Sequence, residues 1–150
     1  MKLEDEIKQK KFRSEAHKLG VNIIFTYNWL IHRQSSFLKK YGITSQQFNI
    51  LRILRGMQGK PASIKLLRER MLDKMSDASR IVEKLRVKGL VKRTTNTEDR
   101  RACDVLITDK GLAVLTEIDN NFEVIDRLFD ALNDKEMKAL NELLDALRGS

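Results

Sequence analysis

The segment DRRACDVLITDKG, residues 99–111, constrains the fold more than any other part of the chain. Cys103, Val105 and Ile107 fall at every second position within it, which is the period of a half-buried strand. A second short β-prone run covers residues 90–94, and the polar, charged segment 96–101 joins the two runs. The pattern predicts a β-hairpin with a positively charged tip.

A basic amphipathic helix is predicted directly before this hairpin, over residues 76–88. Ser76 can cap the helix, Asp77 lies in the first turn near the positive end of the helix dipole, and Gly89 ends it. A basic helix followed by a cationic hairpin is typical of a winged helix-turn-helix, whose helix enters the major groove of B-DNA. The sequence therefore predicts a mainly α fold with a small β-hairpin wing, and binding to double-stranded DNA.

The expected DNA contacts lie at the start of this helix and in the hairpin tip. Residues at the N-terminus of a recognition helix usually reach base edges, whereas cations farther along neutralise phosphates. Taken alone, the helix could instead present an ordinary solvated charged face, but the hairpin after it favours DNA. The expected contacts are Ser76, Asp77, Ser79 and Arg80 in the groove, Lys84 and Arg86 nearer the phosphates, and Asp99, Arg100 and Arg101 in the hairpin.

The distribution of charge supports this interpretation. The chain has a formal net charge of +8, and segment 44–108 has fifteen Lys and Arg against seven Asp and Glu, whereas segment 109–150 has five against ten. A polyanion would be drawn to the middle segment rather than to the acidic C-terminal third. A merely solvated basic surface is the alternative.

Helices are also predicted on both sides of the basic segment, from apolar residues that recur every three or four positions. The expected elements are a helix over 5–41 with a break near Gly20, a helix over 44–56 capped by Thr44 or Ser45, a short helix over 63–71, a long helix from a cap at Thr108 to residue 132, and a last helix that starts at Asn133 or Asp134.

The apolar stripes of the terminal helices are longer than a small winged-helix lobe can cover. They predict a homodimer held together by N- and C-terminal dimerisation helices, residues 1–43 and 109–150, with residues 44–108 as the DNA-binding lobe. A two-fold dimer implies a roughly palindromic operator with half-sites about one helical turn, ~34 Å, apart. A monomeric bundle that seals the stripes internally is the alternative. The expected interface residues are Leu19, Ile23, Leu115, Phe122, Leu140 and Leu144.

Segment 79–111 resembles the MarR family of bacterial transcriptional regulators. The family's wing signature, D-x-R-x-x-x-V-x-L-T-x-x-G, is matched by Asp99, Arg101, Val105, Thr108 and Gly111, with Ile107 at the Leu position. The resemblance implies a dimeric regulator, expected to be a repressor, whose Arg101 enters the minor groove while Asp99 pairs with its guanidinium. Narrow minor grooves do attract Arg, although a plain surface ion pair is the alternative.

Proteins similar to this one often bind small aromatic or anionic ligands in a crevice between the dimerisation helices and the DNA-binding lobe. Tyr27, Trp29, His32 and Arg33 lie on the first helix where such a crevice could open, although core or interface packing also explains the two aromatic side chains. Neither histidine has a second His or Cys at ligand spacing, so we expect no metal and no other cofactor.

Cys103 is the only cysteine, so the chain can form no internal disulfide, which fits a cytoplasmic protein. We expect Cys103 to behave as a small apolar residue on the inward side of its strand, and a redox-responsive regulator acting through Cys103 is the alternative. The apolar runs are too short to span a bilayer, and residues 1–12 contain no apolar secretion signal.

No catalytic motif accompanies the predicted hairpin. The sequence has no Gly-rich phosphate loop, no G-x-S-x-G and no H-E-x-x-H, and its two histidines are far from an obvious carboxylate partner, so an enzyme is not expected. A winged-helix module that contacts protein or RNA remains an alternative. It would bind with weak salt dependence or without preference for a palindrome, unlike a protein that neutralises several phosphates.

Overall fold

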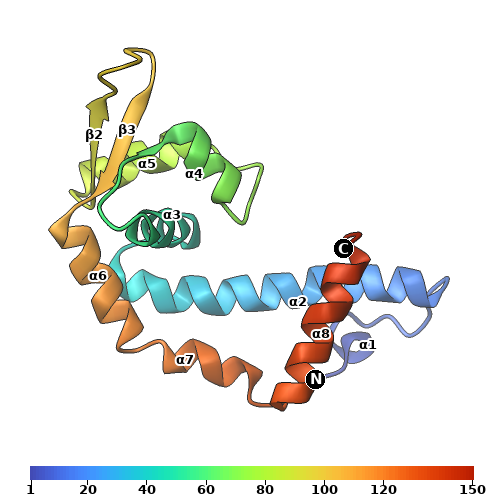
Figure 1. Cartoon of the computed structure of the whole chain (residues 1–150). Helices are drawn as coiled ribbons and strands as arrows, with labels where there is room; N and C mark the ends of the chain where they lie inside the picture. The colour runs from blue at the N-terminus through green and yellow to red at the C-terminus, as the bar shows by residue number, and fades with distance from the viewer.

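Helices form most of the chain, and a small antiparallel sheet projects from one side of it (Figure 1). The computed structural model describes all 150 residues. Its elements are α1 (Leu3–Glu6), α2 (Glu15–Leu38), the 3₁₀-helix η1 (Lys39–Tyr41), α3 (Ser45–Gly56), β1 (Ala62–Ser63), α4 (Ile64–Arg70), α5 (Ala78–Val87), β2 (Val91–Thr95), β3 (Cys103–Ile107), α6 (Asp109–Asp119), α7 (Glu123–Asp126), the 3₁₀-helix η2 (Arg127–Phe129) and α8 (Asp134–Leu147).

The elements fall on two sides of the long helix α2. In Figure 1, α3, α4, α5 and the hairpin of β2 and β3 lie on one side of α2, and α7 lies on the other. Helix α6 descends from the base of the hairpin and joins the two sides. The arrangement is a winged helix with long peripheral helices, which confirms the predicted fold class.

Side-chain caps fix where several helices begin. Thr44 and Gln47 form a reciprocal capping box at the start of α3, and Asn133 and Glu136 form another at the start of α8. At the start of α6, the Thr108 hydroxyl accepts a hydrogen bond from the amide of Gly111 at 3.1 Å. Each cap satisfies an amide that would otherwise lack a partner. The cap predicted at Thr108 is confirmed, and of the predicted alternatives the structure has Thr44 rather than Ser45 and Asn133 rather than Asp134.

The hairpin belongs to a three-stranded sheet with the order β1-β3-β2. Strand β3 pairs antiparallel with both neighbours, so that Val105 lies opposite Arg93 on one side and Ala62 on the other. The hairpin was predicted, but β1 was not. Two residues are too few to show a strand period, and β1 exists because the central strand offers it an open edge.

The core lies between α3, α4, α5, the sheet and α6. Leu51, Leu67, Leu85, Val105 and Leu115 come from these five elements in turn, and none has any exposed surface. Burial of a leucine-sized side chain stabilises a fold by about 1.5–3 kcal/mol. The lobe is therefore held together by one continuous apolar core that includes part of α6.

The predicted break near Gly20 is wrong. Helix α2 continues through Gly20, and the interruption lies between α1 and α2, where Lys8 has φ +55° and Ser14 caps α2 through the amide of His17. A single glycine costs a helix only about 1 kcal/mol, which a helix of this length tolerates.

The helix predicted from Thr108 to residue 132 is also interrupted. It ends at Asp119, and the chain continues as the short α7 and η2. The ring of Phe122 packs between Phe37 and Phe48, with centroids 6.1 and 6.2 Å away. These aromatic contacts hold the chain to α2 and α3 at the point where the helix is interrupted.

Gly111 allows α6 to approach the sheet closely, which generates a stability prediction. A Cβ at this position would lie 2.4 Å from the carbonyl oxygen of Leu90 and 2.7 Å from Cγ1 of Ile107. We expect Gly111→Ala to lower the free energy of unfolding by about 1–3 kcal/mol because backbone and side chain must move apart. Urea unfolding followed by circular dichroism measures the change. Gly56→Ala is the control, since a Cβ there meets nothing within 4 Å, and equal stability of the two variants would contradict this reason.

Candidate nucleic-acid interface

Helix α5 presents one buried and one exposed face. Ala78, Ile81, Val82 and Leu85 are buried against the lobe, whereas the predicted contact residues on the helix are exposed, namely Ser79, Arg80, Lys84 and Arg86. The structure thus brings these four side chains to one solvent-facing surface, as amphipathic spacing requires.

The cations of this exposed face differ in whether they form an ion pair within the chain. Arg86 donates two hydrogen bonds to Glu83, at 2.7 and 3.0 Å, and the resulting stabilisation of the carboxylate lowers the pKa of Glu83. Arg93 of β2 approaches the same carboxylate at 3.4 Å. Arg80 and Lys84 instead line an open hollow of about 320 Å³ beside α3 and form no ion pair. Arg80 and Lys84 are therefore the cations of α5 that are free to meet an anionic partner.

Ser76 and Asp77 have local structural roles at the start of α5. Asp77, not Ser76, caps the helix, because its carboxylate accepts a hydrogen bond from the amide of Arg80 at 3.2 Å. The hydroxyl of Ser76 accepts one from Nε2 of Gln46 on α3 at 3.1 Å. The predicted Ser76 cap is one residue too early, which is the usual size of a boundary error.

The tip of the hairpin is organised by Asn96. Its side-chain oxygen accepts hydrogen bonds from the amides of Glu98 and Asp99, at 2.8 and 3.0 Å, and its nitrogen donates to the carboxylate of Asp104. Asn96 was not predicted as a site residue. The sequence feature that could have identified it is an Asn at the end of a predicted strand, where the side chain can close a turn.

Asp99 holds the backbone of the tip rather than the guanidinium of Arg101. Its carboxylate accepts a hydrogen bond from the amide of Arg101 at 2.9 Å, and neither residue belongs to an ion pair of the structure. The pairing implied by the family resemblance is therefore not observed. Arg100 and Arg101 are both exposed in the loop between β2 and β3, and neither forms an ion pair within the chain.

The turn between α4 and α5, residues 71–77, is fixed by two amides of α3. Oδ1 of Asn49 accepts a hydrogen bond from the amide of Leu72 at 2.9 Å, and Nε2 of Gln46 reaches Asp73 at 3.5 Å. Within the turn, Asp73 accepts from the amide of Met75 at 2.9 Å, and this hydrogen bond is the main cause that lowers the pKa of Asp73. Sequence reasoning missed Gln46 and Asn49 because their partners are more than twenty residues away.

Cys103 is half-buried at the start of β3, as expected for the inward side of the strand. Its sulfur accepts a hydrogen bond from Nε of Arg93 at 3.2 Å. Arg93 lies on the neighbouring strand β2, two positions from Thr95, the residue directly opposite Cys103.

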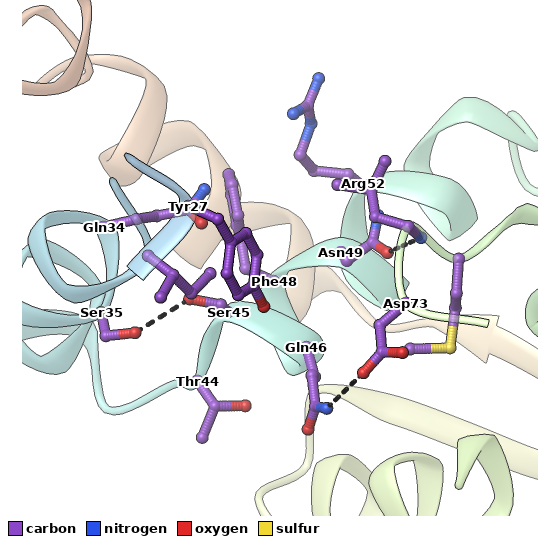
Figure 2. A pocket seen from close by; sticks show the side chains of 13 residues that line it. Tyr27, Gln34, Ser35, Thr44, Ser45, Gln46, Phe48, Asn49, Arg52 and Asp73 are labelled. Carbon is purple, nitrogen blue, oxygen red and sulfur yellow. Dashed lines mark hydrogen bonds between the residues drawn. The ribbon is translucent and has the colours of Figure 1, made fainter. Parts of the chain in front are cut away.

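A cavity of about 560 Å³ lies between α2, α3 and the α4–α5 turn. Figure 2 shows the ring of Tyr27 beside Phe48, with Gln46, Asn49 and Asp73 on the side of the turn. The cavity is lined by Tyr27, Ile31, Gln34, Ser35, Thr44, Ser45, Gln46, Phe48, Asn49, Arg52, Met71, Leu72 and Asp73.

The four residues predicted for an effector pocket do not share one cavity. Only Tyr27 lines the cavity beside α3, whereas Trp29, His32 and Arg33 line a second hollow of about 560 Å³ against the N-terminal segment. Residues two to six positions apart on a helix can face different directions, because each position turns by about 100°. In this chain the four residues are therefore divided between two hollows.

Several predicted interface residues are exposed on the peripheral helices. Leu19 of α2 is 48% exposed and Leu140 of α8 is 46% exposed, while Ile23 and Leu144 are partly buried. Helix α8 has no fully buried residue and also exposes Leu143 and Leu147. The chain does not seal these apolar stripes within itself, contrary to the monomeric-bundle alternative.

Leu115 and Phe122, which were also predicted at the dimer interface, differ from these exposed residues because they contact the core. Leu115 has no exposed surface and lies in the core of the lobe, and Phe122 packs on that core through Phe37 and Phe48. The assignment of Leu115 to a dimer interface is corrected to internal packing, whereas Phe122 packs on the core and stays partly exposed. Helical spacing places both residues on an apolar face, but spacing alone does not distinguish packing inside the chain from packing on a second subunit.

Two further findings concern membranes and metals. No helix is both long enough and apolar enough to cross a bilayer. No group of three or more His, Cys, Asp or Glu side chains is placed to hold a metal ion.

The chain is similar to a known protein family and to characterised relatives. Residues 41–102 match the model of the MarR family. The regulator MhqR of Bacillus subtilis is 24% identical over 128 residues, which cover 85% of this chain and 87% of that protein. The repressor MdtR of Bacillus subtilis is 37% identical over 76 residues, which cover 49% of this chain and 46% of that protein.

Solved structures share the fold over nearly the whole chain. A mutant of MarR from E. coli complexed with operator DNA superimposes with a TM-score of 0.81 at 22% identity, covering 92% of this chain and 99% of that one. BpsR of Bordetella bronchiseptica, whose DNA binding is regulated by 6-hydroxynicotinic acid, superimposes with a TM-score of 0.77 at 22% identity, covering 87% and 98%.

Proposed function

Because this chain belongs to the MarR family of transcriptional regulators, we propose that it is a homodimeric, sequence-specific DNA-binding repressor whose activity responds to a small ligand. The family consists of transcription regulators rather than enzymes. The observation that carries the proposal is the set of unpaired cations on one lobe, Arg80 and Lys84 on α5 and Arg100 and Arg101 on the wing. A protein that binds the chromosome in this way would act in the bacterial cytoplasm.

In the proposed complex, α5 enters the major groove and the wing tip enters the adjacent minor groove. Ser79 and Arg80 would face base edges, while Lys84 and Arg86 would lie nearer the phosphates. Arg86 would have to share its guanidinium with Glu83, so its contribution should be smaller than that of Lys84. Ser76, Asp77 and Asp99 would act mainly by holding the helix start and the wing tip in shape.

The proposed dimer packs the exposed apolar faces of α2 and α8 against those of a second copy. Large exposed apolar patches are uncommon on monomeric proteins. A two-fold assembly would place two α5 helices in successive major grooves, about 34 Å apart, on a roughly palindromic operator. A dimer bound over a promoter would block transcription, and the relative MdtR is named a repressor.

The proposed ligand site is the cavity between α2, α3 and the α4–α5 turn. Its volume of about 560 Å³ lies within the range of about 300–1,000 Å³ that small-molecule sites have. Tyr27 and Phe48 offer aromatic surface, and Arg52, whose guanidinium lies 5.6 Å from the ring centre of Phe48, offers a positive charge. Such a lining suits a small aromatic or anionic ligand.

Two alternatives make different predictions for DNA binding. A winged helix that serves protein or RNA contacts would show little salt dependence on duplex DNA, whereas a regulator that neutralises several phosphates should lose affinity steeply as salt rises. A redox regulator acting through Cys103 would lose DNA binding after peroxide treatment. Titration of the promoter region beside its own gene, at several salt concentrations and before and after oxidation, separates the three.

Substitution of Arg101 tests the role of the wing. We expect Arg101→Ala to weaken operator binding by about tenfold or more, because a charge-assisted hydrogen bond contributes roughly 1.5–3 kcal/mol. Fluorescence anisotropy with a labelled operator measures the affinity, and the melting temperature should not change. Arg127→Ala is the control, since it removes an equal charge from an exposed arginine outside the lobe. A folded Arg101→Ala protein with full affinity would exclude the minor-groove role.

Substitution on α8 tests the dimer. We expect Leu140→Asp to convert the protein to monomers at micromolar concentration, because a carboxylate enclosed in an apolar interface loses its hydration. Sedimentation equilibrium measures the mass. Val87→Asp is the control, since Val87 is 73% exposed on α5 and lies outside the proposed interface. A Leu140→Asp protein that stays dimeric would place the interface elsewhere.

Filling the cavity tests the ligand site. We expect 6-hydroxynicotinic acid, or a member of a panel of benzoates and phenols, to raise the melting temperature of the wild-type protein and weaken its DNA binding. Ile31→Trp should abolish both effects while leaving DNA binding intact, because the larger ring occupies the cavity. His32→Ala, in the second hollow, should retain the response. A response lost in His32→Ala and kept in Ile31→Trp would assign the ligand to the second hollow.

A further inference from the structure

Two large apolar side chains project into solvent from the α4–α5 turn. Leu72 is 88% exposed and Met75 is 92% exposed, more than any other large apolar side chain of the chain. Neither lies on the apolar stripes of α2 and α8 that form the proposed dimer interface. The proposed functions of the wing, α5 and the cavity do not account for this exposure.

The turn that carries these side chains is held in one conformation. Its hydrogen bonds to Asn49 and Gln46 attach it to α3, and the amides of Met75 and Ser76 are bonded to Asp73 at 2.9 and 3.3 Å. The backbone at Leu72 and Met75 therefore has little freedom to fold the side chains back onto the protein. A fixed turn that displays apolar side chains has the form of a contact surface, since ordering it for a partner costs little entropy.

The surroundings of the turn favour DNA as the partner. Met75 lies two residues before Asp77, the cap of α5, and the N-terminus of a recognition helix is the part that enters the major groove. Lys74 lies between the two apolar residues, and Arg80 is exposed in the first turn of α5. The apolar group that DNA presents in the major groove is the C5-methyl group of thymine.

We propose that Leu72 and Met75 contact thymine methyl groups in the major groove, beside the bases faced by the start of α5. The inference rests on the proposed DNA-binding function and adds a source of sequence preference to it. The polar side chains of α5 read hydrogen-bonding groups, whereas these two residues read a methyl group that polar side chains do not distinguish. Each half-site should therefore contain thymines whose methyl groups, and not only their hydrogen-bonding edges, contribute to affinity.

Replacement of thymine by deoxyuridine tests this proposal, because it removes the methyl group and leaves base pairing unchanged. The probe is the duplex recovered by selection with the wild-type protein from a randomised pool, with each thymine replaced in turn. We expect one or more replacements to weaken wild-type binding by about threefold to fourfold each, the effect of one buried methyl group. Met75→Ala and Leu72→Ala should each lose the difference at the thymine that the replaced side chain contacts, the double variant should bind all the duplexes equally, and Met75→Leu should keep the difference.

Lys74→Ala is the matched control within the same turn. It should weaken binding to thymine and deoxyuridine duplexes alike and reduce the salt dependence, since a phosphate contact carries no base information. All variants concern exposed side chains, so their melting temperatures should match the wild type.

The outcomes separate the two proposals. Failure to bind any selected duplex at low salt would overturn the DNA-binding function and this inference with it. Tight binding with no effect of deoxyuridine, or with the same effect in the double variant, would overturn the inference alone. A change of oligomeric state in the double variant would overturn it too, by identifying a second copy of the chain as the partner of the turn.

Discussion

Everything in this molecule depends on the burial of the peripheral helices at the points where they meet the lobe. Leu38 at the end of α2 and Leu115 and Ile118 of α6 have no exposed surface and belong to the same core as α3, α5 and the sheet. No flexible linker separates the lobe from the helices around it. A change in the direction of α2 or α6 must therefore be accommodated within a close-packed core, which responds by discrete shifts rather than by bending freely.

Because of this shared core, the chain does not divide into a lobe and a dimerisation region that pack independently. The proposed boundaries at residues 43 and 109 follow composition and charge, but α6 supplies core residues to the lobe from beyond the second boundary. The proposed DNA-binding lobe would consequently lack part of its apolar core if it were cut at residue 108. The three segments describe roles in the proposed function rather than units that pack independently.

Local sequence signals predicted much of the fold. The period of two in β3, the cap at Thr108 and the two faces of α5 depend on neighbouring residues and were all visible in the sequence. The aromatic contacts of Phe122 and the strand β1 depend on partners far along the chain, Phe37 and Phe48 in one case and Val105 in the other. Periodicity cannot show such partners, and for the same reason it assigned Leu115 to an interface when it lies in the core.

In the candidate site, too, features that depend on neighbouring residues were predicted, whereas contacts with distant residues were not. Charge and helix position located the cations of α5 and the wing, because exposure follows from amphipathic spacing. The contacts of each side chain within the chain did not follow from spacing. Glu83 binds Arg86, Asp99 binds a backbone amide, and Gln46 and Asn49 support the turn between α4 and α5. These contacts decide which charges remain free for a partner.

The two amides of α3 also connect the proposed ligand site to the proposed DNA contact. Asn49, Gln46 and Asp73 line the cavity, and the same three side chains fix the turn that leads into α5. A ligand that took the hydrogen bonds of Asn49 would release the amide of Leu72, and the start of α5 would lose part of its support. The coupling would need no long pathway, because the wall of the cavity and the base of the recognition helix are the same few residues.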